Sequence, residues 1–406
     1  MLDVNKVRKD FPFFSSNPDL IYFDNGATTQ KPQCVIDAVS EFYTLGAANV
    51  HRGDYPLSLH WDALYDKTRE SFAKLLNCQA NEIVYTAGST HSMNQIAYGL
   101  QKNFLKPGDV VLITENEHAS NVMPWFRMRQ ESGIQYEYIP VDKQGNIHME
   151  DAKKAMHAGV KAIAVAGVTN VLGAKQPLKE LAALAHENGA LMIVDGAQSV
   201  PHGPTDVQDL DIDFLGFSGH KMGGPGGTGI IYGKYDLLQK MEPVFLGGGM
   251  NARFEACGDM LYQEAPEKFE AGTPNIEGVI GLGRAAEYLL SLGMENIEEY
   301  EKDLRAYFAE RMKELDNVEF YNPDNAYGPI AFNVKDVFAQ DTGSYLAANN
   351  ICVRSGNHCA KILHEVIGTD STVRASLYFY NTKEEVDRFI EVTKEITLEK
   401  AVGIFF

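Results

Sequence analysis

Long apolar runs are missing from the sequence: no window of its 406 residues approaches the uninterrupted span that a membrane helix needs. The first residues, MLDVNKVRKDFPFF, also lack the apolar region of a secretory signal peptide. Positive charge is scarce too, because 36 Lys and Arg stand against 55 Asp and Glu and give a formal net charge of -19. That charge opposes binding to nucleic acid or to an anionic membrane. We expect a cytoplasmic protein that binds neither.

Cysteine is also sparse. Five cysteines are scattered along the chain without a paired CxxC spacing, namely Cys34, Cys78, Cys257, Cys352 and Cys359. Their odd number and spacing argue against a disulfide framework and against a cysteine-ligated zinc site. The chain lacks internal repeats and low-complexity linkers, and with 45% hydrophobic residues it is long enough for a large core. These features indicate a globular protein of enzyme size, in which one or more of the cysteines are candidates for a working thiol.

Short runs typical of strands alternate with helical patterns through the middle of the chain. The strand-like runs cover 110–114 (VVLIT), 161–168 (KAIAVAGV) and 191–195 (LMIVD), and a helix is expected near 177–188. This order predicts βαβ units, and therefore an α/β fold with a mostly parallel sheet flanked by helices.

The pattern changes near residue 285, where long amphipathic helices are followed by short strand-like runs. We therefore predict a large domain over residues 21–284. A smaller α+β domain is expected over residues 285–406, with residues 1–20 packing against it.

Polar residues follow the predicted strands of the large domain. In parallel sheets ligands bind at the carboxyl ends of the strands. The residues at these ends are Glu117-His118, Thr169-Asn170, Asp195 to Gln198 and, after a further strand-like run at 213–217 (DFLGF), Ser218 to Lys221. We therefore expect the chemistry of the protein to lie among them.

Three of these strand-end residues fit an aldehyde cofactor with a pyridine ring. Lys221, in GFSGHKMGGPGG, lies among glycines that give close access to its amine. Asp195 ends a strand, where an acid needs a partner such as a protonated pyridine nitrogen. His118 has a flat ring that can stack on a planar cofactor and relay protons near neutral pH. Taken singly, each has a plainer explanation: an exposed lysine, a helix cap and a structural histidine.

The segment TAGSTHSMNQIAYGL, at 86–100, adds a candidate phosphate site. Gly88, Ser89 and Thr90 precede an amphipathic helix, so backbone N–H groups and two hydroxyls point out of a helix N-terminus. An ordinary helix cap fits this segment equally well. Combined with the lysine, the aspartate and the histidine, the segment indicates pyridoxal phosphate. A bare metal site at His118, His220 and His358 is disfavoured, because these residues lack ligand spacing.

A second region of interest is ICVRSGNHCAKIL, at 351–363. Cys359 lies in a polar loop beside Arg354 and His358, and we expect these cations to lower the pKa of its thiol. Downstream, Arg374 lies in a strand-like run, where its planar guanidinium suits a substrate carboxylate. The alternatives are an inert half-buried cysteine and a surface ion pair.

Eight stretches spread over nearly the whole chain carry a resemblance to a known family. They are YFDNGATTQKPQ (22–33), NVHRG (49–53), TNVLG (169–173), VDGAQSVPH (194–202), FSGHKMGGP (217–225), FEAGTPN (269–275), RSGNHCA (354–360) and VRASLYFYNT (373–382). In them the chain resembles the fold-type I pyridoxal-phosphate enzymes of the class V aminotransferase group, and more narrowly the Suf-type (group II) cysteine desulfurases.

The resemblance implies roles for the cofactor site. Lys221 would form the Schiff base with pyridoxal 5'-phosphate and later move the α-proton of the substrate. Asp195 would pair with the pyridine nitrogen, Gln198 would contact the ring hydroxyl, and His118 would stack on the ring. The phosphate would be bound by Ser89, Thr90, Ser218 and His220, with Thr273 reaching in from a second subunit of a homodimer.

The resemblance also implies the reaction. Asn170 and Arg374 would hold the carboxylate of L-cysteine, with Asn25 and Arg354 completing the substrate site. Cys359 would accept the sulfur, which gives alanine and a Cys359 persulfide. The persulfide would pass to an acceptor protein in iron-sulfur cluster assembly.

Departures from the family pattern bear on the partner. Relatives that deliver sulfur to a zinc-bearing scaffold carry His at the position of Gln340, and Gln is not a comparable zinc ligand, which favours a SufE-like acceptor. Asn357 replaces a common His in the cysteine loop, and the stretch 87–91 is less basic than usual. The alternatives are a selenocysteine lyase, cysteine sulfinate chemistry, another β-elimination, or a cofactor-binding scaffold without turnover. The joint presence of Lys221, Asp195 and Cys359 argues against the scaffold.

Overall fold

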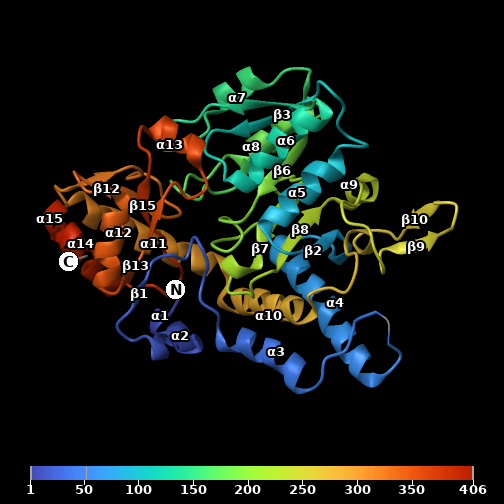
Figure 1. Ribbon diagram of the computed structural model, residues 1–406, viewed down its shortest axis with the longest axis horizontal. Coiled ribbons are helices and arrows are strands. Elements are labelled where there is room, and N and C mark those ends of the chain that lie inside the picture. Colours follow the sequence, from blue (N-terminus) through green and yellow to red (C-terminus); the bar gives the residue numbers. More distant parts are fainter. Residues whose placement is uncertain (1, 52, 405–406) are drawn as a thin grey trace.

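The computed structural model describes residues 2–51 and 53–404 (Figure 1). Arg52 in the stretch NVHRG, together with Phe405 and Phe406 of the apolar tail, lies outside the described residues. Within the described residues, none of the helices combines the length and the apolar character needed to cross a membrane.

A seven-stranded sheet forms the centre of the large domain, with the strand order β2-β8-β7-β6-β5-β3-β4. The five strands from β7 to β4 pair in parallel, whereas β8 is antiparallel to both of its neighbours. The predicted mostly parallel sheet is confirmed. The strands are β2 (Ile83–Thr86), β3 (Val110–Thr114), β4 (Gln135–Ile139), β5 (Val160–Ala166), β6 (Leu191–Asp195), β7 (Phe214–Ser218) and β8 (Gly229–Gly233).

Apart from the edge strand β4, both faces of this sheet are buried, which explains why the other strands are almost continuously apolar. On β6, Met192 and Val194 belong to one core and Ile193 to the other, because successive side chains point to opposite faces. The first core is covered by α3 (Gln33–Thr44), α4 (Pro56–Leu76), α7 (Met149–Ala155), α8 (Leu178–Glu187) and α10 (Ile276–Leu292). The second is covered by α5 (Ser89–Leu100), α6 (Met123–Ser132) and α9 (Tyr235–Lys240).

Helix α8 shows how the local sequence sets these elements. Pro177 is its N-cap, and Leu181, Ala182 and Ala185 form the face that packs on the sheet. The helix ends at Asn188, and Gly189 follows with a φ of 67°. The expected helix is therefore confirmed.

A four-stranded antiparallel sheet, in the order β11-β12-β15-β14, forms the small domain. Its strands are β11 (Val318–Phe320), β12 (Ile330–Val334), β14 (Arg354–Gly356) and β15 (Thr372–Ala375). Its core includes the rings of Phe308, Phe332 and Phe389. The helices of this part are α11 (Met294–Lys313), α12 (Ala339–Ala348), α13 (Lys361–Ile367), α14 (Lys383–Lys394) and α15 (Leu398–Gly403).

The amino-terminal segment contributes to a separate two-stranded sheet. Strand β1 (Ile21–Tyr22) pairs in parallel with β13 (Ile351–Cys352) of the small domain. Before it, α1 (Val4–Val7) and α2 (Pro12–Ser16) flank Phe11, whose ring packs on Tyr380. The predicted boundary between residues 284 and 285 falls inside α10, which packs on α3 and α4. The domain limits stay predictions.

One hairpin projects from the body of the molecule, formed by β9 (Asn251–Phe254) and β10 (Met260–Tyr262) (Figure 1). It occupies the segment that begins with the three glycines 247–249. Phe254, Met260 and Leu261 are exposed on it.

Candidate active site

A cleft of about 190 Å³ lies where the carboxyl ends of the large-domain strands meet loops of the small domain. Most of the residues singled out from the sequence line it: Ser89, Thr90, His118, Asn170, Asp195, Gln198, Ser218, His220, Lys221, Arg354, His358, Cys359 and Arg374. Gly26 and Ala27, which the sequence did not single out, line it too.

Lys221 stands at the end of a short helical turn, Gly219–Lys221, that directly follows β7. Burial lowers the pKa of its amine to about 8, against the opposing attraction of Asp195. Within the described residues, Nζ makes neither a hydrogen bond nor an ion pair. An amine of this kind is partly neutral near physiological pH and can attack an aldehyde.

Asp195, at the end of β6, is buried, with 4% of its surface exposed. Its Oδ1 accepts hydrogen bonds from Ser89 Oγ at 3.1 Å and from the Ala197 N–H at 3.0 Å. No contact among the described residues engages Oδ2. The carboxylate is therefore oriented but keeps an oxygen for a cationic partner such as a pyridinium N–H.

The amino-terminus of α5 opens into the same cleft. Gly88 is the N-cap with a φ of 138°, and a Cβ at this position would come within 3.3 Å of Ser218 Oγ. Ser218 Oγ accepts the Ser89 N–H at 2.7 Å. The Thr90 N–H lies in the first turn of α5, where backbone N–H groups have no intrahelical acceptor. This cradle fits a phosphate group, while the Ser89 hydroxyl is engaged with Asp195.

His118 is held in one orientation by its own turn. Its Nδ1 accepts the Ser120 N–H at 3.1 Å, which assigns the remaining ring hydrogen to Nε2 in the neutral form. Burial lowers the pKa of the ring. Ser120 Oγ lies 2.7 Å from Thr90 Oγ1 and so links the histidine to the cradle. Sequence reasoning missed Ser120, although a serine two residues after a histidine is a signal of such a turn.

Glu117 is a second residue that sequence reasoning did not assign. It is buried, and burial raises the pKa of its carboxyl to about 7. The carboxyl accepts from Thr114 Oγ1 at 2.6 Å, from Asn121 Nδ2 at 2.8 Å and from the Ala166 N–H at 3.0 Å. These bonds tie the segment after β3, which carries His118, to the end of β5.

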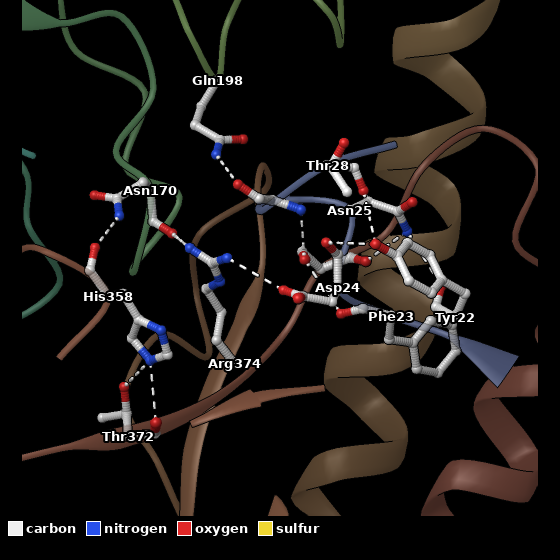
Figure 2. A network of polar contacts seen from close by, with 12 residues as sticks. Tyr22, Phe23, Asp24, Asn25, Thr28, Asn170, Gln198, His358, Thr372 and Arg374 are labelled. Atoms are coloured by element: carbon white, nitrogen blue, oxygen red, sulfur yellow. Dashed lines mark hydrogen bonds and ion pairs between the residues drawn. The ribbon is translucent and has the colours of Figure 1, made fainter. Parts of the chain in front are cut away.

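Arg374, on β15, is the centre of a buried polar network (Figure 2). Its Nη1 donates to the Asn170 carbonyl at 2.9 Å, and its Nη2 lies 3.5 Å from Asp24 Oδ1. Nε has no partner in the described part of the chain. Burial lowers the pKa of this guanidinium to about 10, so it stays a cation at neutral pH. Arg374 lines the cleft, and its planar guanidinium is the kind of group that a carboxylate site requires.

Asn170 connects this arginine to the cysteine loop. Its Nδ2 donates to the His358 carbonyl at 2.8 Å, and its buried Oδ1 has no partner among the described residues (Figure 2). Asn25, in contrast, does not line the cleft. Its amide donates to Ser376 O at 2.8 Å, and its Oδ1 accepts the Tyr380 hydroxyl at 2.5 Å. The Asn25 side chain is thus engaged in joining β1 to the segment after β15.

Cys359 is exposed on the loop between β14 and α13. It and His358 both have positive φ, 57° and 50°, an uncommon backbone conformation for such residues. Asn357 Oδ1 accepts the Cys359 N–H at 3.2 Å. The Cys359 carbonyl accepts the Ala119 N–H at 2.8 Å. The loop is thereby fixed against the segment that carries His118.

The expectation that His358 is a cation beside this thiol is wrong. His358 is 4% exposed, and its Nε2 lies 3.0 Å from both oxygens of Thr372. Burial lowers the pKa of the ring to about 2, so the ring is neutral. The neutral ring lines the cleft together with Cys359, and Arg354 is the cation of this loop that lines it.

Two further predicted residues lie away from the cleft. Thr273 is exposed and is not part of the cleft lining. Gln340 is exposed on α12. Their predicted roles involve other chains and stay predictions.

Together the unpaired amine of Lys221, the buried carboxylate of Asp195 and the amino-terminus of α5 fit pyridoxal phosphate. Asp195 suits the ring nitrogen, the first turn of α5 suits the phosphate, and Lys221 suits the aldehyde.

Comparisons with known proteins identify the family of the chain. The family model described as aminotransferase class-V matches residues 21–389. A probable cysteine desulfurase of Halalkalibacterium halodurans is 41% identical, over 97% of this chain and 98% of its own length. A cysteine desulfurase of Escherichia coli K12 is 41% identical over 96% and 97%.

Solved structures agree as well. The apo cysteine desulfurase of Thermococcus onnurineus has a TM-score of 0.93 and 38% identity, over 97% of this chain and 98% of that one. The cysteine desulfurase CsdA of Escherichia coli has a TM-score of 0.91 and 33% identity, over 100% and 99%. The chain therefore belongs to the class-V aminotransferase family, in the branch of it that contains these cysteine desulfurases.

Proposed function

We propose that the protein is an L-cysteine desulfurase, which takes the sulfur atom of cysteine onto Cys359 and releases alanine. One observation carries the proposal: the buried amine of Lys221 and the exposed thiol of Cys359 line the same cleft. Relatives named cysteine desulfurases, 41% identical over nearly the full chain, support it.

Pyridoxal phosphate, bound through its aldehyde to Lys221, supplies a ring that accepts electrons from the substrate. Asp195 would keep a proton on the ring nitrogen, Gln198 would contact the ring hydroxyl, and His118 would cover the ring face. Thr90, Ser218 and His220 would hold the phosphate at the start of α5, with Ser89 orienting Asp195.

The substrate carboxylate would bind to Arg374 and Asn170, which both line the cleft. Arg354 would add positive charge at the same end of the cleft. Lys221, with a pKa of about 8, is matched to taking the α-proton of cysteine and returning one near neutral pH. Asn25 would act on this site through the position of its neighbour Gly26.

Sulfur transfer would then take place on the exposed loop. The Cys359 thiolate would form a bond to the substrate sulfur while the substrate C–S bond breaks. The electron pair of that bond would stay with the carbon fragment, which takes up a proton and leaves as alanine. Because Cys359 is exposed, its persulfide would be open to an acceptor protein.

We further propose that the chain belongs to group II, on the strength of the loop RSGNHCA at 354–360. The exposed Gln340 favours a SufE-like acceptor over a zinc-bearing scaffold, because its amide is a poor zinc ligand. A homodimer in which Thr273 reaches the neighbouring site, and a cytoplasmic location, complete the proposal.

The test combines one spectrum and two product assays. Purified protein is examined for visible cofactor absorption and then for alanine and persulfide after addition of L-cysteine. Wild type is expected to show all three signals. Cys359→Ala should keep the absorption and lose the persulfide, while Cys257→Ala, which changes another exposed cysteine, should behave like wild type.

Two results would overturn the proposal. A colourless protein that pyridoxal phosphate does not restore would contradict the cofactor assignment. Absorption without alanine from cysteine, but with alanine from selenocysteine in both wild type and Cys359→Ala, would assign a selenocysteine lyase instead.

A further inference from the structure

A second, smaller cavity lies on the far side of Gln198. Its volume is about 30 Å³, and it shares Val168 and Gln198 with the cleft. The rest of its lining comes mainly from α11, including Glu298, Glu301 and Arg305, and from the segment 326–328. The cavity therefore lies between loops of the large sheet and a helix of the small domain.

Arg305 is a buried guanidinium on this lining without a charged partner. It is 2% exposed, and one bond, from Nη2 to the Asn322 carbonyl at 2.7 Å, engages it. Nε and Nη1 are buried and have no hydrogen-bond partner among the described residues. Burial lowers the pKa of the group to about 9, which still leaves it ionised at neutral pH. A buried, uncompensated charge is costly, so a compensating group is expected.

The acids of the cavity form no ion pair with Arg305 among the described residues, although Glu301 Oε1 is buried without a hydrogen-bond partner. Glu301 Oε2 lies 2.7 Å from His202 Nδ1, and Glu298 Oε1 lies 3.1 Å from Lys175 Nζ. Neither acid contributes to the pKa shift of Arg305, whose cause is burial alone.

A further cation stands beside the cavity. Lys302 Nζ lies 5.0 Å from the ring centroid of Tyr327, and Lys175 Nζ lies 4.4 Å from the same centroid. No ion pair in the described part of the chain involves Lys302. Lys302, like Arg305, lines the cavity, and together with Lys175 these cations outnumber Glu298 and Glu301, so that the charge balance favours an anion.

We propose that this cavity binds a small inorganic anion, chloride in size and charge, held by the free N–H groups of Arg305. The volume admits about one or two water-sized groups. It is too small for sulfate or for a metabolite carboxylate with its carbon chain. Water alone would satisfy the N–H groups but would leave the charge uncompensated. The anion would hold α11 against the back of Gln198.

The first experiment uses the cofactor-loaded wild-type protein. Crystals soaked in bromide are expected to show an anomalous peak at hydrogen-bond distance from Arg305 Nε or Nη1. In solution, chloride titrated against gluconate at constant ionic strength should raise the unfolding midpoint. Above the dissociation constant, each tenfold increase in chloride should multiply the folded-to-unfolded ratio about tenfold.

Variants on the same helix sharpen the test. Arg305→Met has a similar length without the charge and should lose the chloride dependence. Arg311→Met is the matched control, because Arg311 is paired with Asp387 and lies away from the cavity, and it should keep the dependence. If Arg305→Met fails to fold, the bromide peak in wild type decides alone. Water density without a bromide peak, or equal stability in chloride and gluconate, would overturn the proposal.

Discussion

The cleft has a buried wall in the large domain, which carries Lys221, and an exposed wall in the small domain, which carries Cys359. The two walls hold their reactive atoms in different ways. Lys221 follows a central strand of the seven-stranded sheet, and burial lowers the pKa of its amine. Cys359 is exposed on a loop of the small domain, which hydrogen bonds to Asn170, Ala119 and Asn357 hold in place. The comparison indicates that burial sets the pKa of the amine. The thiol, in contrast, is positioned by a few hydrogen bonds and stays accessible to a partner.

The largest effect is expected on the buried wall. Lys221→Ala removes the group that we propose moves the α-proton, and loss of such a group typically slows turnover by about 10²–10⁴-fold. Alanine formation from cysteine measures the loss, together with a changed visible spectrum. Lys240→Ala, at an exposed position, is the control. Turnover near the wild-type rate in Lys221→Ala would remove the amine from the mechanism.

Arg374 lies between the two walls, and Arg374→Lys tests its planar guanidinium while keeping the charge. Hydrogen bonds to a charged group contribute about 1.5–3 kcal/mol, so KM for cysteine should rise about tenfold to a hundredfold, with a smaller change in kcat. Steady-state kinetics measure the split. Arg388→Lys, at an exposed ion pair, should leave KM unchanged. A fall in kcat at constant KM would contradict the carboxylate role.

The pH dependence of cofactor uptake tests whether burial tunes the amine. Lys221 is protonated below its pKa of about 8 and neutral above it, and the neutral amine attacks the aldehyde. The uptake rate should therefore rise about tenfold between about pH 7 and about pH 9. The measurement follows visible absorption after pyridoxal phosphate is added to the apo protein. A rise centred near the ordinary lysine pKa would show that the interior does not shift the amine.

The smallest effect is expected on the exposed wall. Asn357→Ala removes the bond to the Cys359 N–H, which is worth about 0.5–1.5 kcal/mol, so sulfur transfer should slow about twofold to tenfold. Single-turnover persulfide formation measures the change. The cofactor spectrum should stay that of wild type, since Asn357 does not line the cleft. A lost cofactor spectrum would mean that the two walls are not independent.

Much of the large domain followed from local pattern. The runs at 110–114 and 191–195 coincide with β3 and β6, because strands buried on both faces are continuously apolar and short. The clustering of His118, Asp195 and Lys221 was also predictable, since the carboxyl ends of neighbouring parallel strands meet at one edge of a sheet.

The sequence by itself determined which residue types follow which strands. It therefore predicted a lysine, an acid and a helix amino-terminus around one cofactor. Only the tertiary structure decided their surroundings. In the sequence His358 looks like a cation in a polar loop, yet burial against Thr372 makes it neutral. Arg305 looks like a surface residue of an amphipathic helix, yet it is buried without a charged partner. Charge state depends on desolvation and on partners distant in the chain, which local patterns do not encode.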